Sequence, residues 1–272
     1  MAPPKFKDLG KKPNDIILDD SKYESKCEVK TAAKGLNLTS CFTREDTKGI
    51  KGSLEAKGKL ADFDITTNLK DDSTLTVSVE NTTLVQGLKL KVDTAPVTLA
   101  IQKVSFEYKH DLAFLTGLYD HSAKDGPKVD LSAAFAGNGF SGGISASKVD
   151  PKNLGSAKPE FALQYDASDY TLHAFCKESG KNAGGSAMYK VNSDTTVAVK
   201  VAQKEAKLDI ALGGTYSVDT DTDVSVTVSQ DRMLRALIES KISPALKIKG
   251  SAMLNADKMS GHKWGLEMLY SL

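Results

Sequence analysis

Apolar and polar residues alternate along most of the chain. Within the stretch 87–94, Leu88 and Leu90 would share one face of an extended strand, while Lys89 and Lys91 would share the other. Successive side chains of a strand point to opposite sides, so a period of two predicts strands with one apolar and one polar face. The same alternation recurs in the ranges 50–60, 197–201, 224–228 and 246–254. The pattern predicts an all-β protein.

Turn residues separate the alternating runs at short intervals. Gly, Pro, Asn and Asp gather in the ranges 70–73, 124–127, 136–139, 149–153 and 217–221. Such short connections leave no room for crossover helices, so we expect an antiparallel meander. Counting the runs predicts about 19 strands, near 23–31, 35–43, 48–59, 62–68, 74–80, 87–94, 99–109, 111–119, 128–136, 139–147, 159–167, 169–177, 183–191, 194–202, 206–217, 222–229, 233–241, 244–254 and 262–271.

A meander of this length predicts a closed barrel. Open twisted sheets rarely exceed about 10 strands, and a free edge invites pairing with other chains. In a closed meander with an odd number of strands, the first and last strands run parallel. We therefore expect the segment 23–31 to pair in parallel with 262–271.

The composition of the two faces indicates where the barrel lies. The apolar faces consist mainly of Val, Leu, Ile and Ala, and the opposite faces carry many lysines. In a wide membrane barrel the apolar face meets lipid and the polar face meets a water-filled lumen. The alternative is a soluble β-rich binding protein whose apolar face is buried. The negative mean hydropathy does not decide between the two, because alternating residues cancel in any average.

The first residues follow a different pattern. Phe6 and Leu9 lie one helical turn apart, which predicts a short amphipathic helix that Pro13 interrupts. A second turn could begin at Pro13 and carry Ile16 and Ile17. The alternative is a loosely ordered tail. We expect a single domain, 1–272, in which 1–21 is the helical segment and 22–272 is the barrel.

Several classes of function are disfavoured. The 36 basic and 35 acidic residues nearly cancel, so the chain lacks the overall positive charge that attracts nucleic acid. The three cysteines and four histidines are scattered, without the spacing of a disulfide framework or a metal site. No nucleophile motif, cofactor motif, signal peptide or long apolar helix is recognisable. We therefore predict a protein without catalysis or cofactor.

Lysines dominate the predicted lumen. Alternation places the following lysines on the polar face: Lys51, Lys57, Lys59, Lys89, Lys91, Lys109, Lys200, Lys207, Lys247, Lys249 and Lys263. The acids assigned to the same face are Glu55, Asp93, Glu107, Asp209 and Glu267. A wide, hydrated pore of this kind would discriminate modestly in favour of anions, because water and salt screen each charge. The alternative is that these lysines cover a solvated outer face.

Four short motifs resemble the voltage-dependent anion channels. They are the opening segment from Pro3 to Lys11, the run Gly87-Leu88-Lys89, the run Gly184-Gly185-Ser186 and the stretch 244–266. The resemblance spans nearly the whole chain, and the order and spacing of the motifs make it specific. It implies a 19-stranded barrel of the mitochondrial outer membrane with a helical segment inside its pore. It also implies voltage-gated, weakly anion-selective diffusion of ions and small metabolites, including adenine nucleotides.

The resemblance suggests roles for particular residues. Gly87, Leu88 and Lys89, with Lys11 and Lys12, become candidates for nucleotide contacts, although no phosphate-binding loop favours tight binding. The gating segment would contain Phe6, Leu9, Gly10 and Pro13. The expected partners are membrane lipids, ATP/ADP and small anions in transit, a homo-oligomer and outer-membrane docking proteins.

The chain also departs from the family pattern. Asn68 and Leu69 stand where animal members place a lipid-facing glutamate, and Asp19 and Asp20 end a segment that carries lysine and glycine in several relatives. Regulation through that glutamate is therefore not expected here. The competing hypothesis is the protein-import pore of the same membrane, for which a lumen with acidic patches would be expected. The Gly87-Leu88-Lys89 motif, the opening segment and the basic lumen favour the anion channel.

Overall fold

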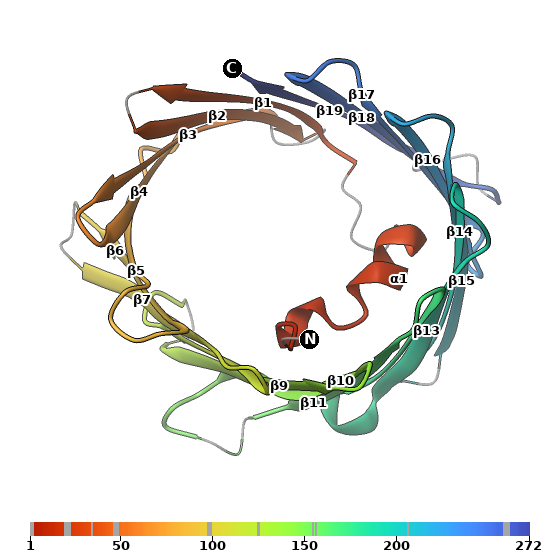
Figure 1. The fold of residues 1–272 in the computed structure, drawn as a ribbon, viewed down its shortest axis with the longest axis horizontal. Helices are drawn as coiled ribbons and strands as arrows, with labels where there is room; N and C mark the ends of the chain where they lie inside the picture. Colours follow the sequence, from red (N-terminus) through yellow and green to blue (C-terminus); the bar gives the residue numbers. More distant parts are fainter. Residues whose placement is uncertain are drawn as a thin grey trace.

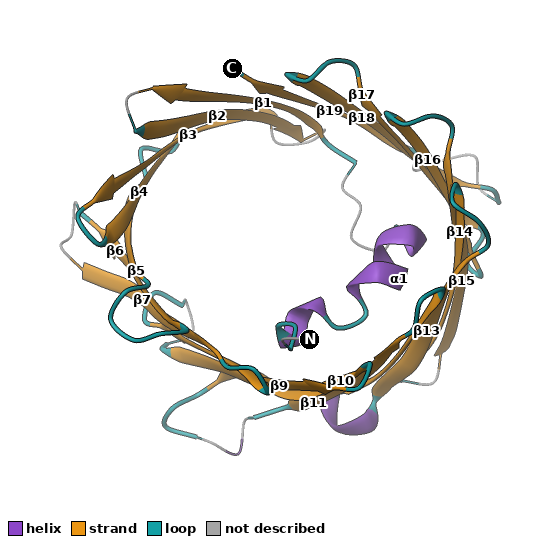
Figure 2. Ribbon diagram, viewed as in Figure 1, coloured by secondary structure: helices purple, strands orange, loops and turns teal. Residues whose placement is uncertain are grey.

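The computed structural model is a ring of strands around an open lumen (Figures 1 and 2). It describes residues 3–18, 23–33, 35–45, 49–96, 100–123, 126–153, 155, 157–205, 207–257 and 262–272. The strands are β1 Ser25–Ala33, β2 Leu36–Glu45, β3 Gly49–Leu60, β4 Phe63–Lys70, β5 Leu75–Asn81, β6 Leu88–Ala95, β7 Ala100–Lys109, β8 Ala113–Asp120, β9 Lys128–Gly137, β10 Phe140–Val149, β11 Pro159–Asp166, β12 Tyr170–Lys177, β13 Asn182–Lys190, β14 Thr195–Lys204, β15 Lys207–Ser217, β16 Thr222–Ser229, β17 Met233–Lys241, β18 Leu246–Asn255 and β19 Lys263–Ser271.

Each strand pairs antiparallel with the next, and the ring closes between its first and last strands. Lys26 to Lys30 of β1 run parallel to Glu267 to Ser271 of β19. The predicted all-β class, the 19-stranded barrel and its parallel closure are thus confirmed. Each strand end lies within two residues of its predicted position.

The N-terminal segment folds as two short helices inside the ring. They are η1, Phe6–Asp8, and α1, Lys11–Ile17, which contacts strands β12 to β16 (Figure 1). The expectation that Pro13 interrupts the helix was wrong. The helix already begins at Lys11, so Pro13 lies in its first turn, where amide protons have no partner within the helix and the missing N–H costs little. The break comes earlier, at Gly10, whose φ of 76° is left-handed.

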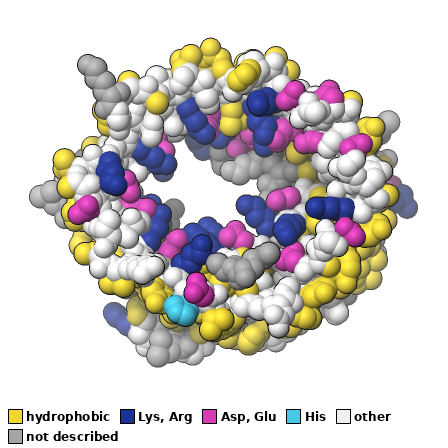
Figure 3. Space-filling view, viewed as in Figure 1, with side chains coloured by type: hydrophobic (Ala, Val, Ile, Leu, Met, Phe, Trp, Pro, Cys, Tyr) yellow, Lys and Arg dark blue, Asp and Glu magenta, His cyan; other side chains and the backbone are white. Residues whose placement is uncertain are grey.

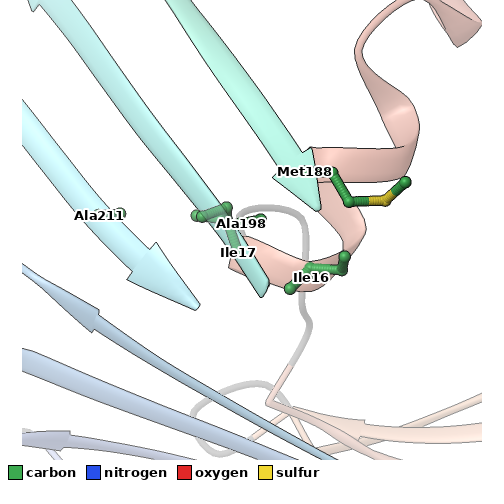
Figure 4. Packing of buried hydrophobic residues seen from close by; sticks show 5 residues of the cluster. All are labelled: Ile16, Ile17, Met188, Ala198 and Ala211. Atoms are coloured by element: carbon green, nitrogen blue, oxygen red, sulfur yellow. The ribbon is translucent and has the colours of Figure 1, made fainter. Parts of the chain in front are cut away.

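The buried apolar core is small and lies between α1 and the barrel wall. Ile16 and Ile17 pack against Met188 of β13, Ala198 of β14 and Ala211 of β15 (Figure 4). Most of the other large apolar side chains of the strands lie on the outside of the ring, and many are exposed, as in Leu163, which is 67% exposed. This arrangement is the reverse of a soluble protein, in which such side chains would be covered.

The two ends of the barrel can be distinguished by the course of β1. We call the end at which β1 begins rim A and the end at which it finishes rim B. Residues 23 and 24 precede β1 at rim A, where a Cβ added to Gly265 of β19 would be 2.7 Å from the backbone of Glu24. Asp19, Asp20 and the predicted 21/22 boundary lie outside the described residues. Among the described residues, no helix is long and apolar enough to span a bilayer.

Candidate functional site: the lumen and its N-terminal segment

Contacts with the internal segment identify the inner face of the barrel. Lys5 Nζ lies 2.6 and 2.7 Å from the two carboxylate oxygens of Glu107 on β7. The Thr227 hydroxyl on β16 donates to the carbonyl oxygen of Ile16 at 3.0 Å. The segment lies within the ring (Figure 1). Glu107 and Thr227, which bind it, therefore point into the lumen.

The pairing register between strands extends the assignment of inward-facing residues to the rest of the ring. Lys89 is opposite Glu107, and in an antiparallel pair opposite residues share a face. The same reasoning leads from Thr227 through Arg235 and Met253 to Lys263. It places on the inner face all the lysines named from the sequence, namely Lys51, Lys57, Lys59, Lys89, Lys91, Lys109, Lys200, Lys207, Lys247, Lys249 and Lys263. Leu88, Leu90, Leu246 and Ile248 alternate with them and face outward.

Carboxylates neutralise many of these lysines. The ion pairs are Lys57 with Glu55 at 3.0 Å, Lys89 with Glu80 at 2.6 Å, Lys91 with Asp93 at 3.3 Å, and Lys247 and Lys249, the latter at 2.6 Å, both with Glu239. Glu80 and Glu239 were absent from the acids expected in the lumen. Their inward direction follows from alternation, but the lysine that each one binds depends on the register between strands. The lumen is therefore more evenly charged than the sequence suggested (Figure 3).

Other lysines of this set keep an uncompensated charge. Within the described part of the chain, the structure gives no ion pair to Lys59, Lys109, Lys207 or Lys263. Their positive field extends into the lumen, attenuated over about 8 to 10 Å by salt at physiological strength.

A row of alternating charges crosses the parallel seam of the barrel. Glu239, Lys249, Glu267 and Lys26 occupy neighbouring inward positions on β17, β18, β19 and β1. Lys26 also contacts Glu28 on its own strand, with 2.7 Å between the ammonium nitrogen and the nearer carboxylate oxygen. Opposite charges at facing positions stabilise a strand pair by a few tenths of a kcal/mol up to about 1 kcal/mol. The row therefore supports closure where the pairing is parallel.

A buried polar cluster holds the start of α1. The amide of Gly10 donates to Gln164 Oε1 at 2.7 Å, and Gln164 in turn donates to Asp166. Asp166 also accepts a hydrogen bond from Lys12 Nζ at 2.7 Å. The His173 ring lies beneath Gly10, so near that a Cβ on Gly10 would be 2.3 Å from the ring. Sequence reasoning did not assign Gln164, Asp166 or His173 to this site, since only the fold brings β11 and β12 beside the segment.

Two further glycines make room for the segment on this wall. A Cβ on Gly143 of β10 would lie 3.0 Å from the Phe6 ring, and one on Gly213 of β15 would lie 2.7 Å from the Ile16 carbonyl oxygen. A Cβ on Gly143 would also lie 2.4 Å from the Ala133 carbonyl oxygen on β9, so this glycine allows the neighbouring strand to approach closely as well. The docking wall is thus lined by small, mostly uncharged residues.

A cavity of about 890 Å³ lies beside the segment. Lys5, Phe6 and Leu9 line one side, and Lys91 and Lys200 belong to its wall. The nucleotide candidates are not brought together there. Gly87 forms the turn before β6 and its carbonyl oxygen accepts the Lys109 amide at 2.8 Å, while Lys89 is paired with Glu80 and Lys12 with Asp166. A defined nucleotide site at these residues stays a prediction.

Residues suited to metal binding do not gather. In the parts of the chain that the structure describes, no group of three or more His, Cys, Asp or Glu side chains has a metal-binding arrangement. Cys27, Cys41 and Cys176 are free thiols. Leu69, at the position of the glutamate expected from the family, faces outward and is 44% exposed, and Asn68 faces the lumen opposite Glu55.

Comparison with known proteins decides the family. The model of the family described as "Eukaryotic porin" matches residues 2–265. The chain belongs to the eukaryotic porin family. This porin is 28% identical over 278 residues to the "Non-selective voltage-gated ion channel VDAC2" of Meleagris gallopavo, with 97% of this chain and 93% of the relative covered. It is 29% identical over 277 residues to the "Non-selective voltage-gated ion channel VDAC3" of Homo sapiens, with 97% and 96% covered.

Solved bacterial porins share the fold of this porin. A mutant of the Rh. blastica porin aligns with a TM-score of 0.53 at 14% identity, covering 85% of this chain and 95% of that one. At this identity the likeness concerns the barrel architecture alone. Family membership confirms that this porin is a voltage-gated, non-enzymatic channel and a β-barrel of the mitochondrial outer membrane.

Proposed function

We propose that this porin passes ions and small metabolites by diffusion, adenine nucleotides among them, with a weak preference for anions. The observation that carries the proposal is the inward register of the lysines, several of which have no ion pair within the described residues. The relatives are named as non-selective channels. A weak preference fits that description, because the ion pairs of the lumen leave only a modest surplus of positive charge.

The division of the chain into residues 1–21 and 22–272 belongs to the same proposal. The 22–272 unit forms the conduit, and the N-terminal segment with Phe6, Leu9, Gly10 and Pro13 sets its inner width. Leu9 and Pro13 are buried against the wall, and Phe6 is half-buried beside the cavity. Changes in the position of this segment would alter the free cross-section of the lumen.

The partners we propose are those expected from the sequence. Lipids contact the exposed apolar outer face, and ATP/ADP and small anions pass through the lumen. A homo-oligomer and docking proteins of the outer membrane would bind the outer face and the rims. The protein-import pore is the weaker alternative, since the relatives that cover nearly the whole chain are named as ion channels.

Reconstitution of the purified protein in a planar bilayer tests the proposal. We expect single-channel steps, a small reversal potential of anion-selective sign across a KCl gradient, and a lower conductance at large voltages of either sign. Release of trapped ATP from vesicles would test passage of nucleotides. A cation-selective reversal potential together with block by a basic presequence peptide would contradict the proposal and favour the import pore.

A further inference from the structure

Arg44 is a charged side chain on the lipid face of the barrel. Among the described strand residues, and leaving aside the bulge of β10 near Lys148, the register turns the other charged side chains inward. Arg44 on β2 is the exception, because its partners are Ser25 on β1 and Ile50 on β3, both outward positions. Its side chain is exposed. An arginine directed toward lipid is costly at mid-bilayer, so such a residue belongs at the interface with a partner for its charge.

The position of Arg44 in its strand places it at that interface. It is the residue before the last in β2, and Ser25 is the first in β1, so both lie at rim A. The structure assigns Arg44 no ion pair within the described residues. The other arginines differ, because Arg232 is bound to Asp257 and Arg235 faces the lumen opposite Thr227. Arg44 therefore presents guanidinium N–H donors without an ion-pair partner among the described residues, at the edge of the hydrocarbon layer.

The neighbours of Arg44 supply the remaining parts of a lipid site. Phe42 and Ile50 are 54% and 71% exposed on the same outer face and offer apolar contact to acyl chains. Strand β19 flanks β1 on the side away from β2 (Figure 1). Trp264, near the start of β19, is 65% exposed. Two strand spacings, about 10 Å, separate β19 from β2. Tryptophan prefers the headgroup region, so Trp264 marks the same membrane level from the other side of the seam.

We propose that Arg44, Ser25 and Trp264 form a binding site for the phosphate headgroup of an anionic phospholipid at rim A. The guanidinium donates two hydrogen bonds to the phosphate, the Ser25 hydroxyl adds a third, and the Trp264 ring packs against the glycerol region. Phe42 and Ile50 contact the acyl chains. The planar fork of arginine matches a phosphate better than lysine does. The bound lipid covers the outside of the parallel seam, where β1 and β19 meet.

The single tryptophan of the chain provides the readout. The full-length protein is placed in phosphatidylcholine nanodiscs that contain increasing fractions of either phosphatidylglycerol or phosphatidylcholine with brominated acyl chains. Bromine quenches tryptophan at short range, so Trp264 reports which lipid adjoins it. We expect the anionic lipid to reach half-maximal quenching at an about fivefold lower fraction, corresponding to about 1 kcal/mol for one basic side chain at the surface.

Variants separate this site from general charge attraction. Arg44→Gln should abolish the difference between the two lipids, Arg44→Lys should retain part of it, and Arg232→Gln, a matched change at rim A, should leave it intact.

Equal quenching by both lipids in the unmodified protein would overturn the proposal, as would a preference that survives in Arg44→Gln. Relief of quenching by millimolar inorganic phosphate would identify a site for free phosphate instead of a lipid site. If the Arg44→Gln variant does not insert, the quenching titration of Arg44→Lys tests the proposal instead. An unchanged preference for the anionic lipid in Arg44→Lys would contradict recognition by the planar guanidinium.

Discussion

Reversal of the charge of four luminal lysines should reverse the ion preference of the channel. The change is the simultaneous replacement of Lys89, Lys91, Lys247 and Lys249 by glutamate. Their ion pairs would then become carboxylate clusters, and Glu239 would lose both of its cations. Each substitution exchanges a positive for a negative charge, so the lumen changes by about eight charges.

The size of the effect follows from Coulomb's law. One charge about 10 Å from a permeating ion in water contributes about 0.4 kcal/mol, which salt of about 0.1 M reduces to about 0.15 kcal/mol. Eight charges therefore change the free energy of an ion in the lumen by about 1.2 kcal/mol. Because the change has opposite sign for an anion and a cation, each partitions about sevenfold differently, and the anion-to-cation permeability ratio changes about fiftyfold, enough to reverse a weak preference.

The reversal potential across a KCl gradient is the measurement, with insertion confirmed by single-channel steps. A matched control replaces Lys152 and Lys158, which lie in the loop between β10 and β11 outside the strands, and should leave the sign unchanged. An unchanged sign in the fourfold variant with normal insertion would refute the reasoning. The variant should insert normally, because the four positions lie on the hydrated inner face, where a glutamate escapes the cost that a charge has on the lipid face.

Two further substitutions have defined expectations. Glu239→Gln releases both β18 lysines from their shared carboxylate and should strengthen the anion preference, which the same bilayer assay measures; a shift toward cations would contradict the pairing. Gly10→Ala should displace the N-terminal segment, because the new methyl group would overlap the His173 ring, and protease access to the segment should increase. Gly35→Ala is the matched control, since Gly35 has a similar φ of 81° but no atom within 4 Å of an added Cβ. Equal effects of the two alanines would show that backbone strain alone is responsible.

The alternation of the chain was sufficient to predict the barrel. A period of two with short turns allows only an antiparallel meander, and the odd number of strands requires that β1 and β19 meet in parallel. The direction of each luminal lysine also follows from alternation, because adjacent residues of a strand cannot share a face. These properties depend on local geometry and on counting, which the sequence contains.

The pairing of charges could not be obtained in the same way. Lys89 binds Glu80 although the two are on different strands, and Lys247 and Lys249 share Glu239. A shift of one strand by two residues would preserve every inward direction yet change each of these partners. The degree of neutralisation in the lumen is therefore a property of the register.

The place of the N-terminal segment was likewise decided by the tertiary structure. The sequence predicted a short amphipathic helix, but Gln164, His173 and Thr227, which hold it, come from strands far along the chain. Such contacts depend on which strands of the ring present small, uncharged side chains at the level of the N-terminal segment along the barrel axis. Alternation, turns and strand count were determined by the sequence itself, whereas charge pairing and the docking of the segment arise only when the ring closes and distant strands meet.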